Sequence, residues 1–171
     1  MWEYDGRSRP PFAAAPGPNQ ESVWDYPRPP VVVRTTRKVE VYYRGHMLAS
    51  STQALRVLET AGPPTFYLSP SDVNVDYLSV TVATSYCEWK GIARYWQLHM
   101  EDASNVAVAW CYPEPNPDYA ILAGLVSFYP SRVECFVDDE RVQPQPGSFY
   151  GGWVTHEIVG PIKGDPGTEA W

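Results

Sequence analysis

Proline constrains this chain more than any other feature, because 18 of its 171 residues are proline, spread from Pro10 to Pro166. Proline lacks a backbone donor and interrupts helix interiors and central strands, so the elements should be short and joined by rigid turns. Turn signals recur about every 8 to 12 residues, a spacing typical of sandwiches and barrels. The sequence therefore predicts a mainly β fold: a compact antiparallel β barrel or sandwich of six to eight short strands with two short helices.

Alternation of apolar and polar residues locates the strands. Val39 and Val41 alternate with Lys38 and Glu40, and Arg44-Gly45-His46 then turns the chain back, which predicts a hairpin. Three more strands, at 75–86, 93–100 and 105–112, predict an antiparallel meander. The other segments with strand composition are 31–36, 65–70 and 132–142.

Two segments favour short helices instead. In SSTQALRVLET, at 50–60, Ser51 or Thr52 can cap a helix whose Leu55 and Leu58 share a face. A second helix is expected around 119–126, framed by prolines.

Composition divides the chain into three parts. Residues 1–30 form a Pro-rich N-terminal arm, 31–142 the β domain, and 143–171 a Gly- and Pro-rich C-terminal arm. A free tail gains nothing from bulky aromatics, yet the N-terminal arm carries Trp2 and Trp24, and the C-terminal arm Trp153 and Trp171. We therefore expect the arms to wrap the domain or a partner subunit.

Charge and hydropathy exclude several partners. A net charge of -7 and a pI near 4.9 repel phosphate backbones and anionic lipid headgroups, so neither nucleic acid nor a membrane surface is expected as a partner. No window approaches the length and hydropathy of a membrane span, and the first residues lack the apolar core of a signal peptide. Three widely spaced cysteines suit free thiols. A soluble, cytoplasmic protein is expected.

The common cofactor and metal motifs are missing from the sequence. There is no phosphate-binding Gly-Lys-Ser/Thr loop, no Gly-x-Gly-x-x-Gly and no Gly-x-Ser-x-Gly elbow. His46, His99 and His156 lack the spacing of metal ligands, and the acidic run at 138–140 is typical of a solvated hairpin turn. We expect no cofactor and no metal, although ligands brought together from distant parts of the chain remain an alternative.

The aromatic-rich stretch SYCEWKGIARYWQLHM at 85–100 contains Cys87 and Lys90, three residues apart. A nearby cation favours the thiolate, so Cys87 can be a nucleophile, while Lys90 can orient a ligand or act as a Schiff-base amine. Alternatively, Cys87 is a small core residue and Lys90 a solvated loop cation. The sequence favours packing for Cys87, because no local signature pairs it with a base.

Glu59 lies at a predicted corner, three residues before Gly62-Pro63-Pro64. A rigid corner can hold its carboxylate against a pocket containing Tyr67, where burial would suit it to general acid or base catalysis. The alternative is a surface carboxylate paired with Arg56. The residues themselves do not decide between the two.

Several ordered motifs resemble a known family. RVLETAGPPTFYLSPSDV at 56–73, CEWKGIARYW at 87–96, the step WCYP at 110–113 and VSFYPSRVECFVDDERV at 126–142 resemble the bacterial and fungal family called domain of unknown function 427. The flanking segments look like its longer form, found in cyanobacteria and some fungi. The resemblance implies a compact antiparallel β domain that forms a small homo-oligomer, with no assigned reaction.

The resemblance also places weight on particular residues. It implies roles for Glu59, Tyr67, Cys87, Lys90, Tyr95 and Trp96, and so moves Glu59 toward a pocket; Tyr112 belongs to the WCYP step. Arg56 and Arg132 are further candidates for binding an anion. Some catalogues label the family a nucleotidyltransferase, but this sequence lacks the Gly-Ser followed by Asp-x-Asp that would hold a nucleotide and two metals.

Two hypotheses about function follow. The first is an aromatic-lined small-molecule pocket of a cofactor-free enzyme, a hydrolase, isomerase or lyase, with Glu59 as general acid or base and Lys90 or Arg56 orienting the ligand. The second is a non-catalytic ligand-binding or homo-oligomeric module, expected as a homodimer. A thiol enzyme based on Cys87 is a third, weaker option.

Overall fold

The computed structural model describes residues 2–101 and 103–171, and these residues form short strands and four 3-10 helices. The strands are β1 Glu21–Ser22, β2 Val31–Arg34, β3 Val39–Tyr43, β4 His46–Ser51, β5 Leu55–Leu58, β6 Thr65–Tyr67, β7 Leu78–Cys87, β8 Gly91–Leu98, β9 Ala107–Cys111, β10 Val126–Phe128, β11 Glu134–Val137, β12 Glu140–Arg141, β13 Gln143–Pro144, β14 Trp153–Val154 and β15 Ile158–Val159. The helices are η1 Val23–Asp25, η2 Pro70–Asp72, η3 Val75–Tyr77 and η4 Pro117–Leu122.

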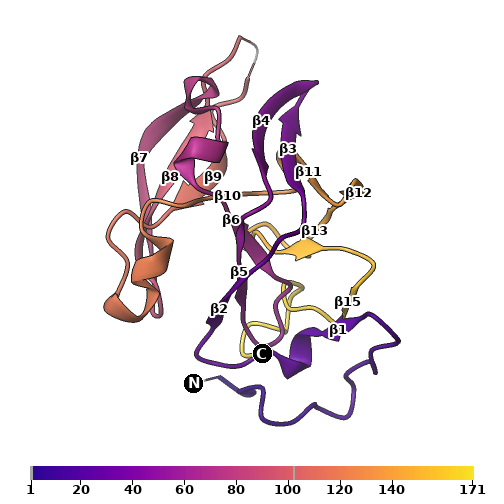
Figure 1. Ribbon diagram of the computed structural model, residues 1–171. Coiled ribbons are helices and arrows are strands. Elements are labelled where there is room, and N and C mark those ends of the chain that lie inside the picture. The colour runs from indigo at the N-terminus through magenta and orange to yellow at the C-terminus, as the bar shows by residue number, and fades with distance from the viewer. Residues whose placement is uncertain (1, 102) are drawn as a thin grey trace.

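Three antiparallel sheets surround the main core. The meander β10-β9-β8-β7 stands on one side of Figure 1, the sheet β12-β11-β3-β4 on the other, and β2-β5-β6 runs below and between them. Within the described residues these sheets do not close into a barrel, so the fold is sandwich-like. The predicted mainly β, antiparallel fold is confirmed.

Alternation along the strands builds this core. Val39 and Val41 of β3 are fully buried, and they meet Leu48 of β4 and Phe128 of β10 in one apolar cluster. The predicted hairpin between β3 and β4 is present, and its turn residues Arg44 and Gly45 both have positive φ, at 48° and 83°. This is the turn geometry that matches the twist of two paired strands.

The helix predicted over 50–60 is wrong. Residues Leu55–Leu58 form β5, which pairs with β2 on one side and β6 on the other. Leu55 and Val57 are buried at alternate positions, whereas the predicted helix rested on the spacing of Leu55 and Leu58. Pairing on both edges satisfies the backbone of β5 and overrides the weak local preference for a helix.

The second predicted helix is shorter than expected and of a different type. A kinked 3-10 segment, η4, covers Pro117–Leu122, and the chain then enters strand β10 at Val126. Tyr119 inside it has non-helical dihedrals, φ -115° and ψ 18°. The helix therefore ends four residues before the predicted boundary.

Both arms pack on the rest of the chain. Trp24 of the N-terminal arm is fully buried, and its Nε1 donates to the carbonyl of Pro161 at 3.0 Å. Strand β1 pairs in parallel with β15, which joins the two arms directly. Trp153 of the C-terminal arm lies in the main core, where its Nε1 donates to Phe128 O at 2.9 Å.

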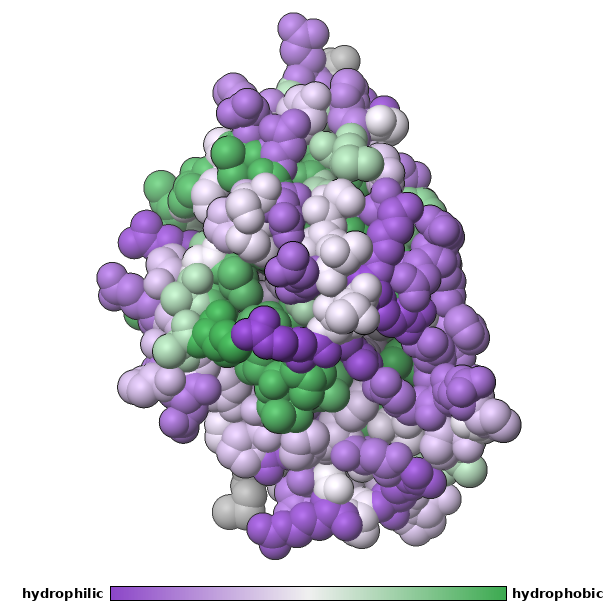
Figure 2. All heavy atoms as spheres, viewed as in Figure 1, coloured by the Kyte–Doolittle hydropathy of each residue, from purple (hydrophilic) through white to green (hydrophobic). Residues whose placement is uncertain are grey.

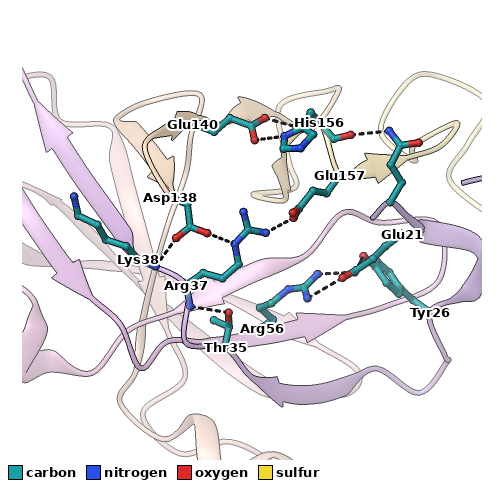
Figure 3. Close-up of polar contacts among 11 residues, drawn as sticks. Glu21, Tyr26, Thr35, Arg37, Lys38, Arg56, Asp138, Glu140, His156 and Glu157 are labelled. Atoms are coloured by element: carbon teal, nitrogen blue, oxygen red, sulfur yellow. Dashed lines mark hydrogen bonds and ion pairs between the residues drawn. The ribbon is translucent and has the colours of Figure 1, made fainter. Parts of the chain in front are cut away.

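Ion pairs fasten the arms to the sheets, as Figure 3 shows. Arg56 on β5 pairs with Glu21 of the N-terminal arm at 2.7 Å. Arg37 bridges Asp138 and Glu157, and so connects the loop before β3, the β11–β12 turn and the C-terminal arm. The arms are thus tied to the domain by polar as well as apolar contacts.

The surface in this view is mostly hydrophilic, with apolar residues gathered over β2 (Figure 2). Val31 of β2 is 39% exposed. No helix among the described residues is both long enough and apolar enough to cross a membrane.

Candidate functional site

A cavity of about 430 Å³ lies between the sheets and the two arms. The end of β5 and strand β6 line one part of it, and the β7–β8 hairpin with β8 and β9 lines another. The remaining wall comes from the arms, through residues such as Trp2, Arg28, Tyr150 and Lys163. This volume falls in the range of small-molecule sites.

Aromatic side chains form the part of the wall that the strands supply. Tyr67, Trp110, Tyr112 and Tyr129 belong to one buried cluster. Trp110 Nε1 donates to the Tyr67 hydroxyl at 3.0 Å, and the rings of Trp110 and Tyr129 lie 4.5 Å apart. Gly151 of the C-terminal arm sits against Trp110, and any Cβ at this position would overlap the indole ring.

The tyrosines of the cavity are neutral hydrogen-bonding groups. Burial raises the pKa of Tyr67, Tyr112 and Tyr129 well above the usual value of 10.0. Their hydroxyls therefore keep the proton at neutral pH and can donate to a ligand. Tyr95 adds a fourth hydroxyl, which lies 2.6 Å from Ser85 Oγ.

Lys90 lies in the hairpin that connects β7 and β8. Cys87 pairs with Gly91 across this hairpin, and Gly91 has φ +95°, a conformation that favours glycine. Asn116 braces the loop, since its Nδ2 donates to Trp89 O at 2.8 Å and its backbone N to Lys90 O at 3.1 Å. The loop geometry therefore holds the Lys90 side chain in the cavity wall.

The ammonium group of Lys90 has no hydrogen-bond or ion-pair partner among the residues that the structure describes. The residue is only 8% exposed, and the ring of Tyr112, 5.9 Å from Nζ, is its recorded aromatic neighbour. Although the residue as a whole is mostly buried, Nζ is not one of the buried polar atoms that lack a partner, so the ammonium reaches the open space of the cavity, where an anion can pair with it.

The other two cations of the cavity wall are already engaged. Arg28 donates to Tyr4 O at 2.6 Å, Thr60 O at 2.9 Å and Trp171 O at 3.2 Å, and its Nε lies 3.4 Å from Glu59 Oε1. Its side chain is almost fully buried. Arg28 therefore connects the two arms to the corner after β5.

Lys163 is likewise partnered. Its Nζ donates to the main-chain oxygens of Glu169 and Trp171 at 2.9 and 3.0 Å, and it lies 3.9 Å from the ring centre of Trp2. Burial, and secondly the charge of Arg28, lower the pKa of Lys163 to about 8. Its ammonium group thus bonds to the C-terminal arm from inside the cavity, while burial makes the charged form a net cost to the fold.

Glu59 is the carboxylate at the corner after β5, and its side chain is 29% exposed. It lines the cavity and pairs with Arg28, whereas its neighbour Arg56 pairs with Glu21. The alternative of a local Glu59–Arg56 pair is therefore wrong. The guanidinium of Arg28 thus fixes the orientation of a partly exposed carboxylate in the cavity wall.

The structure brings most of the predicted site residues together and leaves three outside. Those that line the cavity are Glu59, Tyr67, Cys87, Lys90, Tyr95 and Tyr112. Arg56 is absent from the lining because it lies against Glu21 (Figure 3). Trp96 follows Tyr95 on β8 and so faces the other side of the sheet, where its Nε1 donates to Cys111 Sγ at 3.3 Å. Arg132 donates to Ala107 O and stacks on Tyr129.

Sequence reasoning missed the contribution of the arms to the site. Arg28, Gln145 and Lys163 line the cavity, and none of them was singled out as a site residue, although Arg28 and Lys163 lie in the flanking segments that resemble the longer form of the family. The aromatic residues of the arms indicated that the arms pack on the domain, but they did not indicate which cations of the arms would line a cavity. Tyr129, in the segment VSFYP, was quoted in a family motif but not assigned to the site.

The three cysteines are free thiols. Cys87 is partly exposed and lines the cavity, whereas Cys111 and Cys135 are buried, and burial raises the pKa of both. Across residues 2–101 and 103–171, no three His, Cys, Asp or Glu side chains gather closely enough to hold a metal ion.

A half-open cavity of small-molecule size, walled by aromatic residues of the strands and bordered by the two arms, thus characterises this β domain. The family model described as domain of unknown function (DUF427), with the label NTP_transf_9, matches residues 31–139. The chain therefore belongs to the DUF427 family. No curated protein matches it. Trp2, Arg28, Tyr150 and Lys163, which complete the cavity, all lie outside the matched segment.

Proposed function

We propose that the cavity binds a small organic molecule carrying an anionic group, and that the protein acts on it by cofactor-free acid–base chemistry. The observation that carries this proposal is Lys90, an unpartnered ammonium among the described residues, placed in an aromatic-lined cavity. A ligand anion would provide the missing partner, and a hydrogen bond to a charged group stabilises by about 1.5 to 3 kcal/mol.

Glu59 is the proposed general acid or base. Its carboxylate lines the same cavity as Lys90, and Arg28 orients it from 3.4 Å. The neutral hydroxyls of Tyr67 and Tyr112 can donate to negative charge that develops on the substrate. This set of groups suits a hydrolase, isomerase or lyase. The three free thiols are in keeping with a reducing compartment, and a cytoplasmic location is part of the proposal.

The test is a thermal-shift screen of the protein against small organic acids, because a ligand that binds the folded state raises its stability. Hits should be lost in Lys90→Met and kept in Lys38→Met, which removes an exposed lysine paired with Glu40 and Asp139. Turnover of a hit should disappear in Glu59→Gln while binding persists. Hits that persist unchanged in Lys90→Met would contradict the proposal.

A second candidate is a binding or assembly module without turnover, and the outer surface of the meander favours it. Val80, Val82 and Tyr86 of β7 are 50%, 103% and 73% exposed, and Ile92 of β8 is 57% exposed. Strand β7 contains no charged residue, so two copies of this acidic chain can approach there without local repulsion.

The assembly candidate predicts a homodimer that uses this surface. Sedimentation velocity should show a concentration-dependent dimer that Val82→Glu abolishes. Met47→Glu, which changes an exposed residue on β4, should leave it intact. A wild-type protein that is monomeric at all concentrations removes this candidate.

A further inference from the structure

The charged groups of the cavity wall restrict the chemical class of the ligand that the cavity can bind. Of its three cations, Arg28 and Lys163 already donate to main-chain oxygens, while Lys90 has no partner within the described part of the chain. The wall also contains two carboxylates, Glu59 and Glu88. The single unpartnered cation favours a ligand with one anionic group. A second negative charge on the ligand would be repelled by the two carboxylates, and no unpartnered cation of the wall would offset this repulsion.

Glu88 lies at the exposed edge of the cavity, next to the N-terminal arm. Its Oε1 accepts from Trp2 Nε1 at 2.6 Å, and the Trp2 ring lies 4.3 Å from the guanidinium of Arg28. The indole of Trp2 thus contacts both Glu88 and Arg28. Lys90 is left as the anchor for a ligand.

The rest of the wall favours a flat, apolar body on the ligand. Trp110, Tyr112 and Tyr129 come from the strand side, and Phe149 and Tyr150 from the C-terminal arm. Aromatic rings pack favourably against one another in stacked or edge-to-face arrangements, so a planar ring of a ligand can pack against this wall. Tyrosine hydroxyls kept neutral by burial add hydrogen-bond donors without adding charge.

From these observations, and resting on the proposed function of the cavity, we infer that the ligand is an aromatic monocarboxylate. Its carboxylate pairs with the ammonium of Lys90, and its ring packs among the aromatic residues of the wall. Phosphate esters and dicarboxylates are disfavoured, because Lys90 is the one cation of the cavity wall that lacks a partner among the described residues. A neutral aromatic compound would cover the ammonium of Lys90 without pairing with it, which costs free energy of desolvation.

Probe molecules that differ in one property separate the contribution of the ligand's charge to affinity from the contribution of its ring. Isothermal titration calorimetry would compare indole-3-acetate with indole-3-acetamide, which keeps the ring and loses the charge, and with acetate, which keeps the charge and loses the ring. Phenyl phosphate supplies a dianion on a ring. We expect indole-3-acetate to bind about 10- to 100-fold more tightly than the amide, which is the range expected for a charged hydrogen bond. Acetate and phenyl phosphate should bind more weakly than indole-3-acetate.

Variants of Lys90 test whether this residue causes the preference for the acid over the amide. In Lys90→Met the advantage of indole-3-acetate over the amide should vanish, while Lys90→Arg, which keeps the charge, should preserve most of it. Lys38→Met is the matched control and should bind as the wild type does. If Lys90→Met does not fold, the wild-type and Lys90→Arg titrations still decide, because the advantage of the acid over the amide must appear in both.

Three results would overturn the inference: an amide that binds as tightly as the acid, tighter binding of phenyl phosphate, or selectivity that survives Lys90→Met. A Lys90-dependent hit of another chemical class, with no binding of any aromatic acid, also overturns it but leaves the proposed function standing. Aromatic acids that bind through Lys90 but are not turned over support the inference and refute only the catalytic part of the proposed function.

Discussion

Replacing Arg28 with methionine tests whether one buried guanidinium holds the two arms and the cavity together. Arg28 donates to Tyr4 O in the N-terminal arm, to Thr60 O after β5 and to Trp171 O in the C-terminal arm. Methionine keeps the apolar stem and removes all of these bonds. The three segments would then lose a shared donor while packing of the stem is largely preserved.

The expected loss of stability is about 3 kcal/mol. Three hydrogen bonds to a charged group are worth roughly 1.5 to 3 kcal/mol each, but much of this is offset because methionine has no guanidinium to desolvate. Glu59 would lose its partner, yet its side chain is 29% exposed, so water can solvate the carboxylate. For a chain of this length, about 3 kcal/mol corresponds to a fall in Tm of roughly 6 to 12 °C.

Urea denaturation followed by circular dichroism would measure this difference. The matched control is Arg9→Met, because Arg9 also belongs to the N-terminal arm but forms an exposed pair with Asp25 at 2.6 Å. Exposed pairs contribute about 1 kcal/mol or less, so this control should be nearly neutral. If Arg28→Met cost no more than Arg9→Met, the main-chain oxygens would be hydrated from the cavity, and the role assigned to Arg28 would be refuted.

Three further predictions concern the cavity. The fold lowers the pKa of Lys163 from 10.5 to about 8, so above pH 8 the unfolded chain binds more protons than the folded chain. The free energy of unfolding should therefore rise between about pH 8 and 10, by on the order of 1 to 2 kcal/mol after screening by solvent. Urea titrations at several pH values should show this rise in the wild type and not in Lys163→Met. Iodoacetamide should modify Cys87 before the two buried cysteines, which mass spectrometry of the digested protein would show, and equal labelling of all three would contradict its placement in the cavity wall. Gly151→Ala should lower stability by about 1 to 3 kcal/mol, measured by urea denaturation, because its Cβ would overlap Trp110, and an unchanged midpoint would mean that the ring can move aside.

The regular alternation of apolar and polar residues was enough to predict the mainly β class, the β3–β4 hairpin and the meander. It failed at 50–60, where Leu55 and Leu58 match a helix and Leu55 and Val57 match a strand equally well. The choice depends on β2 and β6, which flank the segment in space and pair with both of its edges. Such pairing partners are not visible in a short window of sequence.

The site was partly predictable for a related reason. Lys90 and Glu59 lie next to glycine and proline turns, and such turns place side chains at the ends of strands, where cavities form. Arg28 and Lys163 lie in irregular segments without periodicity, and only the tertiary fold brings them beside Glu59. Arg56 had the right chemistry but points to Glu21, because its orientation depends on an arm that folds over β5.

The division of the cavity between the family segment and the arms has a consequence for comparing members of the family. Residues 31–139 supply Lys90, Glu59 and most of the tyrosines, whereas the residues that close the cavity come from outside that range. If the cavity binds a ligand as we propose, two relatives with identical family segments but different flanking sequences would accept different molecules. Ligand preference would then lie in the least regular parts of the chain, and grafting one relative's arms onto another's domain is the direct way to transfer it.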